Sequence, residues 1–277
     1  MMDNIKVKIE SLSTGFLLKK GARKVLHQKL DFQLNAEELV CILGPNGAGK
    51  STLPNGAGKS TLLKTLLGFE LPLEGKVFCN EQELKNISVK EMAQLIAVVL
   101  TDKIDDIYLT ASEIISTGRY PYGGFTGKLS VEDIAQIKSA ESQVGISHLT
   151  ENVFSKLSDG EKQKVMIAMA IAQDTPFIFL DEPVAFIDAP SKIGIMQLLA
   201  QLVEDTGKGI LMATHDLDSA LNYADRIWLL GTNGEWDEGK PDDLLNSGEI
   251  NRFFDKENIS FDIENKRFSW TGNKSNE

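Results

Sequence analysis

The chain has 277 residues, of which 42% are hydrophobic and 25% are charged, a balance typical of one large or two modest globular domains and not of a disordered chain. Its 40 acidic residues outnumber its 29 basic ones, and the net charge of −11 argues against binding to nucleic acid or to an anionic membrane surface. No apolar run approaches the ~20 residues that cross a bilayer, and the opening segment lacks the apolar core of a signal peptide, so we expect a cytoplasmic protein.

The first forty residues predict a β-rich region. Residues 5–10 and 30–34 alternate between apolar and polar side chains, and residues 38–43 form a continuous apolar run that ends at a glycine. Cys41 and Cys79 lie in strand-like segments. In a reducing compartment we expect them to be small buried side chains, not a disulfide or a metal site.

A nine-residue segment then occurs twice in succession, at residues 45–53 and 54–62. The first copy, with Gly44 before it, matches the pattern G-x-x-x-x-G-K-[ST] and follows an apolar strand. Its glycines let consecutive backbone N–H groups surround a phosphate chain, and the helix that follows directs its positive end at the same place. Lys50 would put a charge between the outer phosphates, and Ser51 would offer its hydroxyl to magnesium.

Only one of the two copies can serve as the phosphate loop. In the first register Pro54 falls about one turn into the helix, where proline costs ~3 kcal/mol or more, so the helix must stop. In the second register the helix continues to Gly68, but Leu53 takes the first glycine position. We rank the registers as equal for folding, and we take the first because its motif is complete. Its binding residues are Gly44, Pro45, Asn46, Gly47, Ala48, Gly49, Lys50, Ser51 and Thr52, and the alternative register uses Lys59, Ser60 and Thr61.

Residues 89–99, 110–118 and 130–144 follow the period of a helix and predict a helical insert at about 88–160. Beyond it, predicted helices at 159–173, 190–205 and from near 216 alternate with apolar strands at 177–180, 209–213 and 226–230. That alternation predicts an α/β fold with a parallel sheet covered on both faces. We place one domain at residues 1–240 and a C-terminal appendage at 241–277.

Three polar side chains follow two of these strands. Asp181 and Glu182 end the strand at 177–180, on the sheet edge where ligands bind in parallel sheets. Asp181 would hold magnesium, and Glu182 would polarise the water that attacks the terminal phosphate. His215 follows the next strand and could hydrogen-bond that phosphate. Farther back, Ser158 and Glu161 form an S-x-x-E capping box, so on its own the stretch at 157–173 predicts a well-capped helix.

In order and spacing, these motifs resemble the ATP-binding cassette (ABC) ATPase subunits over about residues 5–230. The resemblance implies a P-loop ATPase core with a parallel sheet, an N-terminal antiparallel β subdomain and a helical insert. It also implies a head-to-tail homodimer in which ATP and Mg²⁺ lie between the phosphate loop of one subunit and the "LSDGE" helix of the other. Ser158 and Gly160 would then face the partner's terminal phosphate, Phe16 would stack on adenine, and Asp188 would couple the two sites.

The segment with the Gly-Arg-Tyr-Pro run, within residues 109–130, is similar to ATPase subunits of bacterial importers for iron chelates, haem and cobalamin. This similarity implies integral-membrane permease partners that dock on the helical insert, which would hold the chain at the inner face of the cell membrane. Two alternatives stay open: a docking module whose doubled loop binds nucleotide poorly, or a soluble ABC ATPase without a transport role.

The sequence departs from the family pattern in three places. Asp159 and Glu161 stand where the usual signature LSGGQ has glycine and glutamine, and their charge should weaken the positive field of that helix end. Thr101 or Asp102 stands in place of a glutamine that links magnesium, water and permease. The third departure is the tandem copy, which we interpret as a mutational or assembly accident because removing either copy leaves the same chain.

Overall fold

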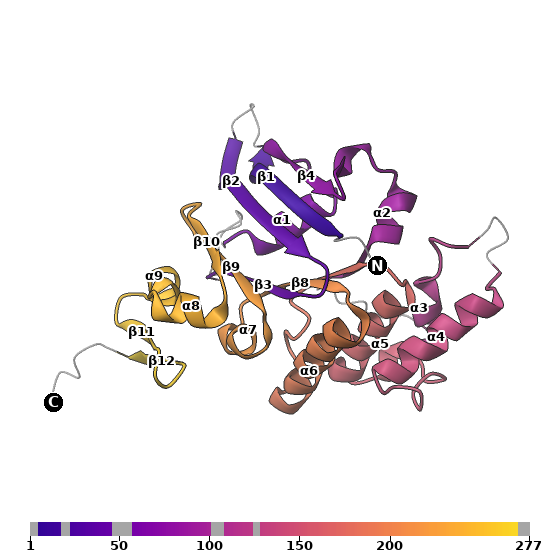
Figure 1. The fold of residues 1–277 in the computed structure, drawn as a ribbon. Coiled ribbons are helices and arrows are strands. Elements are labelled where there is room, and N and C mark those ends of the chain that lie inside the picture. Colours follow the sequence, from indigo (N-terminus) through magenta and orange to yellow (C-terminus); the bar gives the residue numbers. More distant parts are fainter. Residues whose placement is uncertain (1–4, 18–22, 46–56, 101–107, 124–127, 271–277) are drawn as a thin grey trace. The chain divides into compact units, whose positions relative to one another are not determined.

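The computed structural model describes residues 5–17, 23–45, 57–100, 108–123 and 128–270 (Figure 1). The chain divides into two compact units. Unit 1 comprises Met1–Val7, Leu34–Leu39 and Phe78–Met212, and unit 2 comprises Lys8–Gln33, Val40–Val77 and Ala213–Glu277. No helix among the described residues is long and apolar enough to span a membrane.

Most of the first sheet belongs to unit 2. Strands β1 (Lys6–Leu17), β2 (Arg23–Asn35) and β4 (Glu74–Cys79) lie in the order β2-β1-β4, and the short β5 (Gln82–Glu83) pairs antiparallel with the end of β4. These strands contribute four buried side chains to the core, those of Ile9, Leu12, Leu30 and Phe32. The β-rich opening and the antiparallel β subdomain are therefore confirmed.

A second group of strands in unit 2 follows the order β10-β9-β3. The fully buried β3 (Leu39–Leu43) runs parallel to β9 (Arg226–Leu230), and β10 (Trp236–Gly239) runs antiparallel to β9. Phe32 stacks on Trp228 with ring centroids 4.5 Å apart, and this contact joins the two groups of strands. Helices α1 (Lys59–Leu66) and α7 (Leu217–Tyr223) complete this part.

The C-terminal segment of unit 2 forms two short helices and a hairpin, shown in yellow in Figure 1. Helices α8 (Pro241–Asn246) and α9 (Glu249–Phe254) precede the antiparallel pair β11 (Ile259–Asp262) and β12 (Arg267–Trp270). Asp255 accepts a hydrogen bond from the Phe261 N–H (2.8 Å), and the Asn251 amide donates to the Phe261 carbonyl (2.8 Å). The end of α9 thereby holds the hairpin.

Unit 1 contains strands β8 (Gly209–Thr214), β7 (Phe177–Asp181) and β6 (Ile96–Val99), in that order, with β6 parallel to β7. Its helices are α2 (Val89–Leu95), α3 (Ala111–Thr117), α4 (Val131–Gln143), α5 (Asp159–Ala172) and α6 (Ala189–Thr206), with single 3-10 turns at Leu84–Asn86 and Phe154–Lys156. The helices predicted at 110–118, 130–144, 159–173 and 190–205 are confirmed, as are the strands at 177–180 and 209–213.

The prediction of one helix through residues 89–99 is wrong. Helix α2 ends at Leu95, and the next four residues form β6, which pairs with β7 from Ile96–Phe177 to Val99–Leu180. The sequence Ile-Ala-Val-Val is rich in β-branched residues, and three of the four side chains are buried. Pairing with a buried neighbouring strand outweighs the helical period, which such a short apolar run cannot establish.

The Gly-Arg pair of the Gly-Arg-Tyr-Pro run joins helices α3 and α4 of the insert to α5, and the three helices pack together in Figure 1. A Cβ on Gly118 would lie 2.3 Å from the Met169 carbonyl oxygen of α5. The buried Arg119 donates to Asp133 of α4 (2.8 Å) and to the Ala172 carbonyl of α5 (2.8 Å). The close approach of α5 therefore accounts for the glycine, and the buried, hydrogen-bonded ion pair accounts for the arginine.

Candidate functional site

The helix that follows the doubled loop begins in the second copy of the repeat. Gly58 is its N-cap, with φ 71° and ψ 20°, and α1 starts at Lys59. The helix ends next to Gly68, which has φ 72° as expected for a glycine that terminates a helix. Of the first-copy residues, Asn46, Gly47, Ala48, Gly49, Lys50, Ser51 and Thr52 lie outside the described part of the chain.

Two hydrogen bonds join the end of β3 to this second copy. The Ala57 N–H donates to the Pro45 carbonyl (3.1 Å), and the Lys59 ammonium donates to the Gly44 carbonyl (3.1 Å). A Cβ on Gly44 would lie 2.5 Å from the Ala57 Cβ and 2.4 Å from the Leu230 carbonyl oxygen, so only glycine fits there. The strand at one end of the repeat and the helix at the other end therefore meet directly.

The spacing at this junction is that of a single phosphate loop. If residues 46–54 were absent, Ala57 would be the third residue after Pro45, which is the separation of a tight turn closed by one backbone hydrogen bond. Gly44 would then be followed by a loop of normal length that ends in Gly58 and Lys59. The two copies thus contribute different parts of one motif.

The N-terminus of α1 has the chemistry of an anion site. Gly58 has no side chain to cap the helix, and the first turn contains no acidic residue. Lys59 is 7% exposed, so its charge is held close to the helix end, and the Ser60 side chain is exposed. The positive end of the helix dipole and the backbone N–H groups of the first turn favour a phosphate here.

A buried histidine that the sequence analysis missed contacts the same loop. His27 of β2 is fully buried, with Nε2 2.5 Å from the Ala57 carbonyl oxygen and Nδ1 2.6 Å from the Thr14 hydroxyl. Burial lowers the pKa of His27, although the bond to Ala57 opposes this shift. The ring is therefore neutral at pH 7, with Nε2–H donating to Ala57 and Nδ1 accepting from Thr14.

The alternation of β2 hides this histidine. Leu30, Phe32 and Leu34 point inward, and continuing that period toward the N-terminus would place Gln28 inside the sheet. Lys29, however, has φ 51°, and this left-handed residue shifts the alternation by one position. His27 is buried in consequence, and a backbone irregularity of this kind has no signal in the sequence that we could have used.

Two further predicted residues of unit 2 occupy surface positions. Phe16 lies near the end of β1 and is half-buried. His215 is exposed and follows β8 directly, before Asp216, whose carboxylate caps α7 by accepting from the Ser219 N–H (3.4 Å). The strand placement expected for His215 is therefore found, while the ligand contacts of both residues stay predictions.

In unit 1, the acidic pair lies at the end of β7 as predicted. Asp181 is the last residue of the strand and is 6% exposed. Glu182 has φ 49°, an uncommon conformation for a residue with a side chain, and its carbonyl accepts a turn-closing bond from the Ala185 N–H (3.1 Å). A buried carboxylate at a strand end is a suitable magnesium ligand. Thr101 and Asp102, the other suggested metal ligands, lie outside the described residues.

The N-terminus of α5 satisfies its own backbone. The Ser158 N–H and hydroxyl both donate to the Glu161 carboxylate (2.8 and 2.7 Å), and the Glu161 N–H donates back to Ser158 (3.4 Å). The Ser158 hydroxyl and then its N–H lower the pKa of Glu161. The predicted capping box is thus confirmed. Between these two residues, Gly160 faces Ser191, whose N–H donates to Asp188 (3.3 Å).

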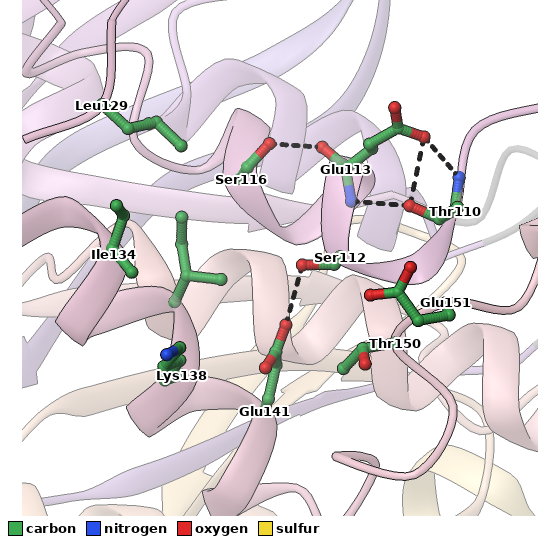
Figure 2. A pocket seen from close by; sticks show the side chains of 11 residues that line it. Thr110, Ser112, Glu113, Ser116, Leu129, Ile134, Lys138, Glu141, Thr150 and Glu151 are labelled. Atoms are coloured by element: carbon green, nitrogen blue, oxygen red, sulfur yellow. Dashed lines mark hydrogen bonds between the residues drawn. The ribbon is translucent and has the colours of Figure 1, made fainter.

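The helical insert of unit 1 also contains an open pocket of about 510 Å³ (Figure 2). The buried Glu141 accepts from the Ser112 hydroxyl (3.0 Å) inside it, and Leu129 and Ile134 form an apolar side. Three carboxylates against one lysine make the pocket acidic. The lining residues are Thr110, Ser112, Glu113, Ser116, Leu129, Ile134, Ile137, Lys138, Glu141, Thr150 and Glu151.

Both cysteines are buried and unpaired. Burial raises the pKa of the Cys79 thiol to about 11 and raises that of Cys41 as well, which keeps both thiols protonated and unreactive at neutral pH. Within the described ranges, no group of three or more His, Cys, Asp or Glu side chains is arranged to hold a metal ion.

Comparisons with known proteins agree with this arrangement. Residues 54–185, which begin at the second copy of the repeat, match the ABC transporter family. An uncharacterized ABC transporter ATP-binding protein of Methanocaldococcus jannaschii is 33% identical over 92% of this chain and 83% of its own length. The ferric enterobactin transport ATP-binding protein of Escherichia coli is 31% identical, with 88% and 85% covered.

A solved dimeric structure of an ATP-binding cassette with bound ADP and phosphate has a TM-score of 0.70 and 26% identity, over 85% of this chain and 98% of that one. The family profile, the relatives and this fold agree with one another. The chain therefore belongs to the ATP-binding ATPase subunits of ABC transporters.

Proposed function

We propose that the chain is the ATP-hydrolysing subunit of a bacterial importer. The best candidate for its cargo is a ferric siderophore, and haem and cobalamin are the other cargo classes. The observation that carries the cargo class is the similarity to the ferric enterobactin transport subunit over 88% of this chain. The Gly-Arg-Tyr-Pro segment supports the same class. The chain would act at the inner face of the cell membrane, bound to permease subunits.

We infer that the second copy of the repeat binds the nucleotide, so the alternative register replaces the first-copy residues in our proposal. The N–H groups from Gly58 onward would surround the phosphates, and Lys59 would neutralise their charge. The carbonyls of Gly44 and Pro45 accept hydrogen bonds from Lys59 and Ala57 and so hold the loop. Phe16 would stack on adenine. The hydrogen bonds Ala57–Pro45 and Lys59–Gly44 carry this assignment.

We also propose Mg²⁺ as a cofactor: Ser60 and Asp181 would each offer an oxygen ligand of the kind that this ion prefers, with the remaining positions left to phosphate and water. The ion would neutralise the charge that develops on the transferred phosphoryl group. Glu182 would orient the attacking water, and His215 would hydrogen-bond the terminal phosphate. In a head-to-tail homodimer, Ser158 and Gly160 would approach the partner's nucleotide, and Asp188 would couple the two sites.

The pocket of the helical insert is a suitable place for permease contact. Its apolar side at Leu129 and Ile134 and its acidic rim at Glu113 and Glu151 match a cytoplasmic loop that carries apolar and basic side chains. We expect Ile134→Asp to weaken permease binding while the ATPase rate of the isolated subunit stays unchanged. Normal binding by this variant would place permease contact elsewhere.

The register is tested with two matched lysine variants of the full chain. Lys59→Ala should weaken ATP binding about 10- to 100-fold, because a charged hydrogen-bond donor to the phosphates is lost. Lys50→Ala, the same change in the identical first copy, should leave affinity within about twofold. A loss confined to Lys50→Ala would assign the site to the first copy.

Transport is tested in vesicles that contain the subunit, its permease and a substrate-binding protein encoded nearby. Uptake of ⁵⁵Fe-loaded siderophore should require ATP, and Glu182→Gln should abolish both hydrolysis and uptake while ATP still binds. ATP hydrolysis without uptake of any iron chelate, haem or cobalamin would leave the ATPase assignment and remove the proposed cargo.

A further inference from the structure

His27 contacts the backbone of the proposed phosphate loop next to the N-terminus of α1. The ring is fully buried, and it contacts the loop in two ways. Its Nε2 bonds to the Ala57 carbonyl (2.5 Å), and its edge lies against Gly58, where an added Cβ would be 2.7 Å from Cε1 and 3.1 Å from Nε2. Ala57 and Gly58 immediately precede Lys59, the first residue of α1.

The Ala57 carbonyl can only accept, so it places the proton of the neutral His27 ring on Nε2, and the Thr14 hydroxyl donates to Nδ1. Thr14 is itself fully buried, and its Oγ1 lies 2.6 Å from Nδ1. When this hydroxyl donates to Nδ1, the neutral ring must carry its proton on Nε2, where it can donate to Ala57. The opposite tautomer would put an Nε2 lone pair against the carbonyl oxygen and leave a buried acceptor without a donor.

We infer that His27, oriented by Thr14, is a positioning residue that holds the second copy of the repeat in its nucleotide-binding conformation. The Ala57 N–H is fixed by Pro45 and its carbonyl by His27, so both sides of this residue are set before Gly58 turns into the left-handed conformation. This inference rests on the proposed function of the second copy.

Two variants of His27 separate the bond to Ala57 from the simple filling of space. In His27→Gln the amide nitrogen reaches the place of Nε2 and can still donate to Ala57. In His27→Asn the amide reaches only the place of Nδ1, so the contact with Thr14 is kept and that with Ala57 is lost. We expect His27→Asn to weaken ATP binding about three- to tenfold, and His27→Gln to stay within about twofold of the unmodified chain.

Calorimetric ATP affinity is to be measured on the full chain together with the unfolding midpoint. Equal affinities for the Asn and Gln variants, or affinities that simply follow the unfolding midpoints, would overturn the inference. If neither variant folds, Thr14→Val replaces them: it should weaken ATP binding about two- to tenfold, with recovery in Thr14→Ser. Normal affinity in Thr14→Val would also overturn it.

The tautomer gives a readout that a purely structural role would not change. The chain has three histidines, so ¹H–¹⁵N spectra of the imidazole rings can be assigned by substitution. His27 should show a protonated Nε2 and an unprotonated Nδ1, and Thr14→Val should shift the Nδ1 resonance, because it removes the hydroxyl that donates to this nitrogen, while Nε2 stays protonated. The Lys59→Ala result separates the two proposals: normal ATP binding there refutes the nucleotide register, whereas its loss together with unaffected His27→Asn refutes only the role of His27.

Discussion

The N-termini of α1 and α5 are both expected to meet phosphate, yet they are built in opposite ways. Helix α1 begins after a left-handed glycine, without a side-chain cap or an acidic residue in its first turn. Helix α5 begins with a complete capping box and carries Asp159 and Glu161 in its first turn. The positive end of α1 is thus available to an anion, whereas that of α5 is already partly neutralised by its own carboxylates.

The comparison teaches how the two helices divide the work. In our proposal the α1 terminus is the primary phosphate site, with Gly44 after β3 and His27 of β2 in contact with its loop. The α5 terminus is stable by itself, and in the ABC resemblance it meets only the nucleotide of a partner subunit. A phosphate that approaches Ser158 must compete with Glu161 for the serine hydroxyl. From these caps we expect strong phosphate binding at α1 and conditional binding at α5.

Among these variants, we expect Gly58→Ala to have the largest effect, because it disrupts the proposed phosphate site at the N-terminus of α1. A side chain at φ 71° is strained, and the new Cβ would lie 2.7 Å from the His27 ring. We expect ATP affinity, measured by calorimetry, to fall at least about tenfold. Gly49→Ala, at the identical position of the first copy, is the control and should be neutral. A greater loss in the control would show that the first copy binds the nucleotide.

Removal of residues 46–54 tests whether the second copy alone forms the site at α1, because the deletion keeps the contacts of this helix terminus in place. The Pro45–Ala57 bond already closes the motif at single-copy spacing, so ATP affinity should stay within about threefold while the free energy of unfolding rises by about 1.5 kcal/mol from the shorter loop. Calorimetry and urea unfolding measure the two quantities. Equal affinities exclude the nucleotide-impaired docking module, and a large gain in affinity on deletion would support it.

Glu161→Gln should make the α5 terminus more like that of α1. Glutamine can keep the capping box but removes a negative charge from the helix end, so we expect kcat/KM for ATP to rise about two- to fivefold at low salt. Glu113→Gln is the matched control because Thr110 and Glu113 form the same capping box at α3. A fall in kcat/KM for Glu161→Gln alone would show that the carboxylate itself serves the reaction.

We expect the smallest effect in the pH dependence of the free energy of unfolding, to which the Glu161 carboxylate contributes. Its folded-state pKa lies below the unfolded value, so its carboxylate stabilises the fold above about pH 4.3, and this contribution is lost as the pH falls through the folded pKa. For this solvent-exposed group we expect a difference from Glu161→Gln of less than about 1 kcal/mol at pH 7. Urea unfolding from pH 7 to pH 3 should show that difference shrink, and a constant difference would contradict the assignment.

Local patterns predicted much of the fold because each rested on neighbouring residues. The capping residue Ser158 and the buried run 177–180 define their elements without help from the rest of the chain. Residues 96–99 do not define their own element, since a four-residue apolar run suits a helix or a strand equally. Its pairing with β7 decided between them. The duplicated motif, the acidic strand end and the capping box identified the ABC resemblance for the same local reason.

The register of the doubled loop lay beyond local analysis. Two identical segments of nine residues have identical propensities, so the sequence by itself determined that one phosphate loop exists but not which lysine completes it. Our proposal of Lys59 rests on tertiary contacts instead: the close contact of Gly44 with Ala57 and the bond of Lys59 to the Gly44 carbonyl. His27 entered the site only because Lys29 reverses the alternation of its strand, and such long-range packing has no counterpart in the local pattern.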